Sequence, residues 1–263
     1  WLQIACLICY SVATRSIFHI ERSNWVIAFD VAWGMLLDAA IGRFRYGSVR
    51  FPLSAWVIGL TATVMIDSRY PLVYFVAVTA AILSKTLFTC RGKHYLNPGN
   101  FGAVVIFQFA VGYALSTQRI YSGYVWPTVV VFVMGLANVI YARKATLCLS
   151  FLASFLLCAW VRTKLGGVHY VMAMGPALSP SFLIFTFHML SDPATTPKSV
   201  KGDLVFAFVV ALLDAFFRMA TVPFGIFYSL FLTSCMMPVY RGWRDGQETA
   251  SARAGSLSSL SPV

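Results

Sequence analysis

The chain has 263 residues, of which 59% are hydrophobic and only 11% are charged, and its net charge is +11. A soluble domain carries about 45–50% apolar and about 25% charged residues, so this composition, with a mean hydropathy of +0.76, excludes an ordinary soluble domain. The basic residues lie between apolar runs, so we expect a lipid bilayer as the surroundings and no nucleic acid as a partner.

Ten apolar runs follow one another along the chain. Most approach the length of about 20 residues that crosses a bilayer as a helix, and they are continuous, as helices in lipid require. The expected spans are residues 1–18, 24–41, 52–67, 70–88, 100–116, 124–142, 146–161, 171–190, 204–222 and 224–240. We therefore predict an all-α polytopic membrane protein with about ten transmembrane helices.

The two ends of the chain differ in character. The first run has no basic segment before it and no cleavage site of small residues, so we interpret it as a span and not as a signal peptide. Residues 1–240 form the expected integral membrane domain. Residues 241–263 are polar and rich in Ser and Ala, which is typical of a disordered tail.

The basic residues predict the orientation in the membrane. With ten spans, alternate connections lie on the same side. One side carries Arg43, Arg45, Arg50, Arg91, Lys93, Arg143, Lys144, Lys198, Lys201, Arg241, Arg244 and Arg253, and the other carries Arg22, Arg69, Arg119, Arg162, Lys164 and Arg218. The positive-inside rule then predicts a multi-pass protein of the plasma (inner) membrane with both termini in the cytoplasm.

The cysteines and histidines do not predict a metal site. Cys6 and Cys9 have the spacing of a metal or redox pair, but no second pair matches them, and cysteines in an apolar helix usually serve packing. His188, near the end of the eighth run, is expected to be a packed and hydrogen-bonded histidine; the alternative is that it faces a cavity.

Charged residues within the runs are informative because an unpaired charge at mid-bilayer costs at least a few kcal/mol. Asp214 and Arg218 have the spacing of an intrahelical salt bridge. Asp30 and Asp38 have no partner on their own run. They either bond to Lys85 or a neighbouring backbone, or line an ion or proton path together with Lys85. Both readings stay open.

The first polar break is "HYLNPGNFG", residues 94–102. Pro98 pushes Asn97 towards extended geometry, Gly99 permits a positive φ, and Asn100 is expected to be the N-cap of a helix that starts at Phe101. A helix N-terminus directs free N–H groups and a positive dipole end at a phosphate, a carboxylate or an electron-rich ring edge.

The second break is "MLSDPATTPKSVKGD", residues 189–203. Here Thr196 is the expected N-cap and Pro197 the first residue of a short helix. Ser191, Asp192 and Thr195 add hydroxyl groups and a carboxylate. Spacing alone leaves open that each break merely joins two helices.

Both breaks also carry a resemblance. "GKHYLNPGNFG" resembles a "KHxFNPxxFG"-like segment of the RnfD/NqrB family, and "FLIFTFHMLSDPATTPKSVKGDLVFA" resembles that family's "FxxFMxTDPxTTPxxxxGRxxxG" segment. The family comprises membrane subunits of the Rnf complex and of the sodium-pumping NADH:quinone oxidoreductase. Within it, the stretch "SPSFLIFTFHMLSDPATTP" most resembles the shorter RnfD-like proteins encoded in enediyne biosynthetic clusters (UnbU-like).

The resemblance implies a bundle of two pseudo-related halves with a flavin in or beside the membrane. It places the cofactor site at Asn97, Pro98, Gly99, Asn100, Phe101, Gly102, Ser191, Asp192, Thr195, Thr196 and Lys198. The family links FMN to Thr in an "SGAT"-like motif, and the nearest match here, residues 11–14, lies in the first run. We therefore expect a non-covalent flavin (FMN or riboflavin) and no covalent FMN. "KGD" replaces the usual "GR", so an anion contact there either weakens or passes to Lys198 and Lys201.

Three classes of function follow. The first is an electron-transport subunit, with or without ion coupling, that needs redox or complex partner proteins. It is not expected to be a stand-alone enzyme, because no GxGxxG motif follows a strand to bind a nicotinamide. The resemblance to the UnbU-like proteins adds an enediyne-type biosynthetic pathway as its setting. The alternative is a transporter or channel for a small molecule or ion, served by Asp30, Asp38 and Lys85. The third is an anchoring protein without a cofactor.

Overall fold

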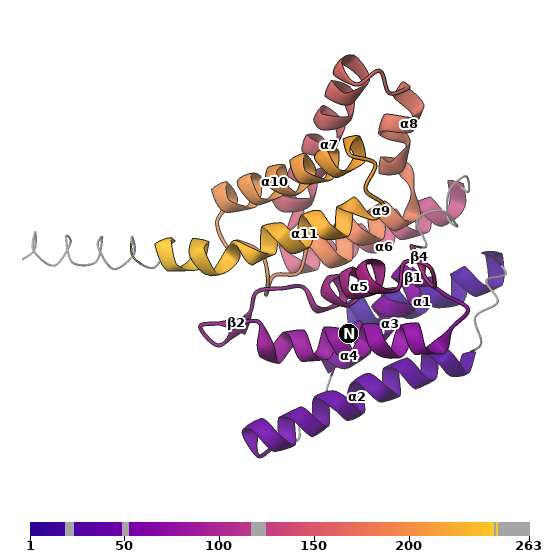
Figure 1. Ribbon diagram of the computed structural model, residues 1–263, viewed down its shortest axis with the longest axis vertical. Coiled ribbons are helices and arrows are strands. Elements are labelled where there is room, and N and C mark those ends of the chain that lie inside the picture. The colour runs from indigo at the N-terminus through magenta and orange to yellow at the C-terminus, as the bar shows by residue number, and fades with distance from the viewer. Residues whose placement is uncertain (19–23, 49–52, 117–124, 245, 247–263) are drawn as a thin grey trace, which may run out of the picture.

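The computed structural model is a helical bundle (Figure 1), and it describes residues 1–18, 24–48, 53–116, 125–244 and 246. The first half of the chain forms α1 (Leu2–Phe18), α2 (Asn24–Tyr46), α3 (Leu53–Met65), α4 (Pro71–Leu87) and α5 (Pro98–Phe109). The predicted tail beyond residue 246 lies outside the described residues, as do Arg22, Arg50, Arg119 and Arg253 of the topology prediction.

The second half is longer and less regular. It forms α6 (Val125–Ala142), α7 (Ala145–Leu165), α8 (Tyr170–Met174), the 3₁₀ turn η2 (Gly175–Leu178), α9 (Pro180–Ile184), the π-helical segment η3 (Phe185–Leu190), α10 (Val200–Met219) and α11 (Gly225–Cys235). Residues 237–244 continue as helix, although residues 241–244 belong to the tail that was expected to be disordered.

Two short strand pairs lie at opposite ends of the bundle (Figure 1). β1 (Ile66–Asp67) pairs antiparallel with β4 (Leu115–Ser116), with Ile66 opposite Ser116. β2 (Thr89–Cys90) pairs antiparallel with β3 (Lys93–His94) in a hairpin, with Thr89 opposite His94.

Helices occupy all ten predicted runs, but two of these runs differ from expectation. The fifth run was predicted to continue to residue 116, yet α5 ends at Phe109 and the chain turns into β4. The eighth run is broken: residues 170–178 and 180–190 are bent by 55°. Pro180 lacks the N–H that would continue the helix, and Ser179 caps the new start by accepting from the N–H of Phe182 at 3.3 Å.

Helix length limits how many crossings the structure supports. Two described helices, within α2 and α7, are long and apolar enough to cross a membrane, and the bent pair counts as a third if it is one span. α5 has 12 residues, which span about 18 Å at 1.5 Å per residue, less than the roughly 30 Å of a bilayer core. Ten full crossings therefore stay a prediction.

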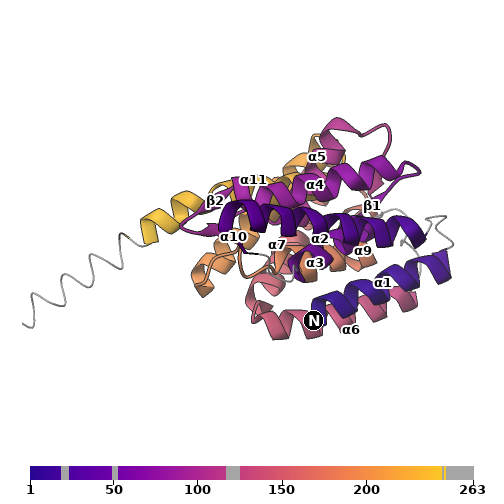
Figure 2. The same ribbon diagram turned by 90° about the horizontal axis from the view of Figure 1, so that it is seen from below.

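The helices of the two halves pack in a recurring order. In the first half α1 packs on α3, α2 on α4, and α4 on α5; in the second half α6 packs on α9, α7 on α10, and α10 on α11. The halves meet where α5 contacts α11 and where α1 lies along α6 (Figure 2). The pseudo-relation of the two halves stays a prediction.

The core is aromatic, and the outer faces are apolar. Phe182 stacks on Phe151 at 5.5 Å and contacts Phe155 at 4.6 Å between ring centroids, and all three side chains are buried. Large apolar side chains such as Leu72 and Phe216 point outward and are more than half exposed. Extensive exposed apolar surface marks a membrane contact, which fits the apolar runs of the sequence.

Candidate functional site

The first loop begins with a tight hairpin. Arg91 (φ 56°) and Gly92 (φ 73°) form the two-residue connection between β2 and β3. Two positive φ values are what a type I′ turn requires, and this turn matches the twist of paired strands. The hairpin brings the chain back so that His94 and the residues after it lie beside the start of α5.

Asn97, and not Asn100, is the N-cap of α5. Its backbone is extended (φ −67°, ψ 119°), as expected before a proline, and its Oδ1 accepts from the N–H of Asn100 at 2.9 Å. Pro98 occupies the first helical position, where its missing N–H is not needed. Gly99 does not use the positive φ that glycine permits; a Cβ there would lie 2.9 Å from Cγ2 of Thr61, so glycine allows a close approach to α3.

The second loop is organised around Asp192. Its Oδ1 accepts from the N–H of Ala194 at 2.9 Å, and its backbone carbonyl accepts from the hydroxyl of Thr196 at 2.8 Å. The predicted helix start at Thr196 and Pro197 is wrong, because Ser199 is the N-cap of α10 and accepts from the N–H of Gly202 at 3.0 Å. The hydroxyl of Thr196 is therefore used within the loop.

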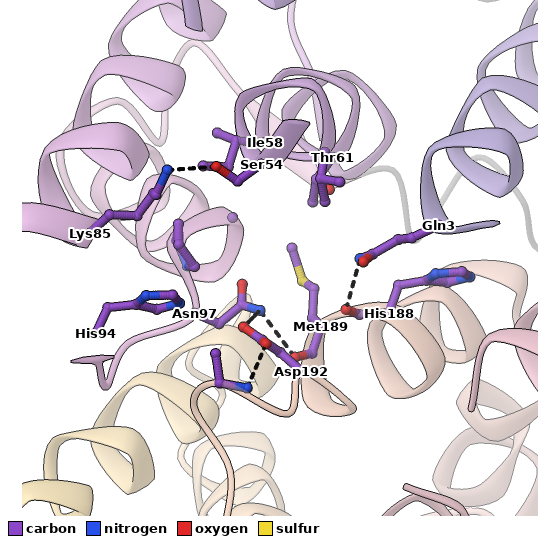
Figure 3. Close-up of a pocket in the computed structure, with 14 residues that line it drawn as sticks. Gln3, Ser54, Ile58, Thr61, Lys85, His94, Asn97, His188, Met189 and Asp192 are labelled. Carbon is purple, nitrogen blue, oxygen red and sulfur yellow. Dashed lines mark hydrogen bonds between the residues drawn. The ribbon is translucent and has the colours of Figure 1, made fainter. Parts of the chain in front are cut away.

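Asn97 joins the two loops. Its Nδ2 donates to the carbonyl oxygen of Met189 at 3.2 Å and to Oδ2 of Asp192 at 3.3 Å. One amide thus caps α5 with its oxygen and holds the second loop with its nitrogen (Figure 3). Asn97 is 9% exposed, so these bonds are largely shielded from competing water, which strengthens them.

A cavity of about 190 Å³ lies beside this junction. α1, α3, α4, both loops and η3 contribute its walls. Its lining residues are Gln3, Ser54, Val57, Ile58, Thr61, Lys85, His94, Asn97, Pro98, Gly99, His188, Met189, Asp192 and Ala194. Gln3, Lys85, Asn97 and Asp192 lie around the space, whereas the ring of His188 points away from it and only the carbonyl oxygen of His188 faces Gln3 (Figure 3). The structure therefore brings both sequence breaks to one place.

Lys85 provides the cationic wall of the cavity. Its Nζ donates to Oδ1 of Asp38 at 2.8 Å and to the hydroxyl of Ser54 at 2.7 Å. Of the two open readings of Asp38, the bond to Lys85 is therefore observed, and the ion or proton path stays a prediction. Asp30 is fully buried in α2 and is not among the residues that line this cavity. The predicted salt bridge between Asp214 and Arg218 is also confirmed, at 2.7 Å.

His188 is packed and hydrogen-bonded, as the first reading of the sequence expected. It is 4% exposed and its Nε2 lies 3.1 Å from the hydroxyl of Tyr10, so it is packed and hydrogen-bonded, and it also lines the cavity. Its Nδ1 is buried and has no hydrogen-bond partner among the described residues.

Several predicted site residues do not reach the cavity. Nδ2 of Asn100 donates to the carbonyl of Phe227 at 3.0 Å and ties α5 to α11. Phe101 packs against Phe88 and Phe231, and a Cβ at Gly102 would meet the backbone oxygen of Ala77 at 2.5 Å.

The remaining predicted residues belong to the second loop. Ser191 donates to the carbonyl of Phe187 at 2.6 Å, and Thr195 is buried and donates to the carbonyl of Asp192 at 3.4 Å. Thr196 and Lys198 line a second pocket next to the first. These residues shape the loop without lining the first cavity.

Sequence reasoning missed part of the lining. Ser54 and Thr61 lie seven residues apart on α3, a spacing that places them on one helix face, and this polar stripe in an apolar run was the available signal. Gln3 and Met189 carried no such signal in the sequence. Gln3 reaches the site only through the packing of α1, and there it donates to the carbonyl of His188 at 3.4 Å.

A buried ion pair between α10 and the residue before α7 holds the end of the second loop in place. Nζ of Lys144 lies 3.0 Å from Oδ1 of Asp203, both side chains are 8% exposed, and Nζ also donates to the carbonyl of Pro197. Asp203 stands where the family pattern has Arg. Its carboxylate is engaged in the first turn of α10, so an anion in this region must be held by other residues.

The electrostatics of the loop are visible at His94. Burial lowers the pKa of His94 below its usual value, the nearby carboxylate of Asp192 opposes this shift, and the cations Lys85 and Arg241 add to it. His94 therefore favours the neutral form near pH 7. The lining then offers one ion-paired cation, one carboxylate, two amides and the neutral imidazole of His94, a set suited to a polar ring edge with alternating donors and acceptors.

The fold and the cavity define a helical membrane protein with a polar site between two loops. A model described as the NQR2, RnfD, RnfE family matches residues 113–245, half of the chain. The chain belongs to this family, whose members are membrane subunits of multi-subunit electron-transport complexes. The matched region contains the second loop and the first loop lies before it. A comparison with curated proteins finds no match.

Proposed function

We propose that the protein is a membrane-embedded electron-transport subunit that holds a non-covalent flavin at the cavity between the two loops. The observation that carries the proposal is the junction of the loops: Asn97 of the first bonds to Asp192 of the second, and both line one polar cavity. The two breaks lie about ninety residues apart in the chain, so their convergence is a property of the fold.

The residues fit the polar edge of a flavin ring. The pyrimidine part of the ring presents carbonyl oxygens and N–H groups in alternation, which three lining residues complement: the carboxylate of Asp192 as an acceptor, and the amide of Gln3 and the ammonium group of Lys85 as donors. The cavity of about 190 Å³ is smaller than the roughly 300–1,000 Å³ of pockets that enclose whole ligands. We infer that it receives this edge only.

A bound flavin would supply one- and two-electron transfer. The chain's own part is to orient the ring and set its charge: Asn97 is fixed by three hydrogen bonds, and Lys85 presents a positive charge moderated by Asp38. Electrons would come from and pass to partner subunits. An enediyne-type pathway as the setting rests only on the stretch "SPSFLIFTFHMLSDPATTP".

A transporter or channel is the second candidate, and one observation favours it. Lys85 and Asp38 form an ion pair with side chains 17% and 21% exposed, and Lys85 borders a polar cavity between helices. Charged residues in such a place are typical of ion or proton paths. Liposome uptake that is lost in Asp38→Asn and Lys85→Gln, in a protein without flavin, would favour this candidate.

The first experiment is the visible absorbance of the purified protein in detergent, before and after acid precipitation. Yellow colour released into the supernatant supports a non-covalent flavin. Colour retained in the pellet means a covalent flavin, which contradicts the expectation from the missing motif. A colourless, folded protein contradicts the flavin proposal and favours transport.

A pair of variants then locates the flavin. Asn97→Ala removes the link between the loops. We expect the variant to lose at least about 90% of the flavin, because losing these buried hydrogen bonds weakens flavin binding by about 1.5 kcal/mol or more. Asn138→Ala is the matched control: Asn138 is also buried and donates to a backbone carbonyl at 2.8 Å, but it does not line the cavity. Equal flavin content in the two variants would contradict the site.

A further inference from the structure

A second pocket, of about 180 Å³, is built largely from cations. Five basic residues line it: Arg91, Lys93, Lys198, Arg241 and Arg244. The other lining residues, Cys90, Pro193, Ala194, Thr196, Pro197, Met237 and Tyr240, are neutral. Among the described residues, then, the pocket has a basic lining and no carboxylate in it.

Three separate segments bring these cations together at one end of the bundle. The β2–β3 hairpin supplies Arg91 and Lys93, the second loop supplies Lys198, and the helical residues 237–244 supply the rest (Figure 1). Hydrogen bonds fix the segments to each other. Arg91 donates to the carbonyl of Arg241 at 3.2 Å, and Nη2 of Arg241 donates to the carbonyl of Ala194 at 2.8 Å.

One of the guanidinium groups is incompletely satisfied. Nη1 of Arg241 is buried and has no hydrogen-bond partner among the described residues. A guanidinium group carries five N–H donors in a rigid fork that matches the oxygens of a phosphate. A buried donor without a partner is costly, so this atom points to an acceptor that completes the site.

The positive-inside rule alone does not explain why these cations lie together in one pocket. Basic residues that only mark the cytoplasmic side can stay solvated and apart, as exposed Arg143 and Lys201 do. Here five like charges converge on a small concave space, where their mutual repulsion is strongest. An anion removes that repulsion, and phosphate oxygens accept from Arg and Lys in charge-assisted bonds.

We propose that this pocket binds a phosphate group, either from the headgroup of an anionic lipid or from a soluble phosphate ester. Ala194 lines both this pocket and the cavity between the loops. An anion held by Lys93 and Lys198 therefore clamps the hairpin to the second loop beside the first cavity. The proposal does not depend on the flavin, since it rests on the charges of this pocket alone.

The test compares two double variants of the full chain in detergent. Lys93→Gln/Lys198→Gln removes two lining charges. Arg143→Gln/Lys164→Gln is the matched control, because it removes two exposed cations outside the pocket. The melting temperature of each is measured with phosphatidylglycerol, with phosphatidylcholine and with glycerol 3-phosphate, at constant ionic strength and pH.

We expect phosphatidylglycerol or glycerol 3-phosphate at a hundredfold excess over Kd to raise the Tm of the wild type and the control by at least about 5 °C. The Lys93→Gln/Lys198→Gln variant should lose most of this shift. A shift with phosphatidylglycerol alone identifies a lipid headgroup, and a shift with glycerol 3-phosphate as well identifies a free phosphate ester. Equal shifts in both double variants, or no shift in the wild type, would overturn the proposal.

The unliganded proteins give a second readout that does not need binding. Because lining cations repel each other, Lys93→Gln/Lys198→Gln should leave the unliganded Tm unchanged or raise it. A purely structural role of these lysines predicts the opposite, a lower Tm without ligand, and that result would also count against the proposal.

Discussion

Asn97 shows how one residue can serve both the fold and the site. Its oxygen satisfies a free N–H at the start of α5, and its nitrogen reaches the second loop. Aspartate could keep the first role but not the second, since a carboxylate does not donate at neutral pH and would face Asp192. The amide is therefore the residue type that this junction needs.

His94 makes stability depend on pH in a defined direction. Its folded-state pKa lies below its usual value, near 6.5 in unfolded chains, so the unfolded state binds more protons between the two values. The stabilising effect of neutral His94 is complete above the unfolded pKa and is lost as the pH falls towards the folded pKa. The unfolding free energy should thus decrease below about pH 6.5.

Replacing the histidine tests this dependence. In His94→Gln the decrease between about pH 6.5 and pH 5 should become smaller, measured by denaturant unfolding at a series of pH values. His169→Gln, at an exposed histidine before α8, is the control and should keep the wild-type profile. An unchanged profile in His94→Gln would mean that other groups cause the dependence.

Two elements of the second half are irregular where the site lies. Pro180 breaks the eighth run, and residues 185–190 continue as π-helix up to the second loop. π-helical turns place an extra residue in a helix and often occur at functional sites. Here the turn carries His188 to the cavity wall, so the irregular helix positions a lining residue.

The contact between α4 and α5 is set by Gly102. A Cβ at this position would lie 2.5 Å from the backbone oxygen of Ala77, which cannot move without shifting α4. We expect Gly102→Ala to lower the free energy of unfolding by about 1–3 kcal/mol. The free energy of unfolding is measured by denaturation in mixed micelles of SDS and a mild detergent.

The matched control is Gly112→Ala, because nothing lies within 4 Å of a Cβ at Gly112 and the change should stay within about 0.5 kcal/mol. Flavin content separates packing from binding. Gly102→Ala should retain flavin where it folds, whereas a direct contact of Gly102 with the cofactor would release flavin from folded protein.

At the scale of the whole molecule, the basic hairpin and the β1–β4 pair lie at opposite ends of the bundle (Figure 1). The positive-inside rule assigns the hairpin end to the cytoplasm. We predict that a membrane-impermeant maleimide labels Cys90 in inside-out vesicles of a variant that keeps only this cysteine. Tyr113→Cys in a cysteine-free background, exposed beside β4, should be labelled only in right-side-out vesicles.

Reversed labelling would invert the orientation, and labelling of both sites from one side would contradict the end-to-end arrangement. The result also bears on the phosphate pocket. All five of its cations belong to the set predicted to be cytoplasmic, so Cys90 reports which leaflet a lipid headgroup would come from.

The sequence by itself determined the class of protein and the places of the two loops. Both are local properties: the length of an apolar run decides whether it suits lipid, and a proline after Asn97 decides where a helix starts. The same local reasoning misplaced the caps at Asn100 and Thr196, because several adjacent polar residues can each cap a helix and only the packed chain selects one.

Tertiary structure decided which side chains meet. The bond from Asn97 to Asp192, the pairing of Asp38 with Lys85 and the convergence of Lys93 with Lys198 each join residues far apart in the chain. It also separated the predicted site residues into those that line the cavity and those, such as Asn100 and Gly102, that pack α5 against its neighbours. Spacing along one helix cannot predict such contacts, because they depend on how helices from both halves pack around a common interface.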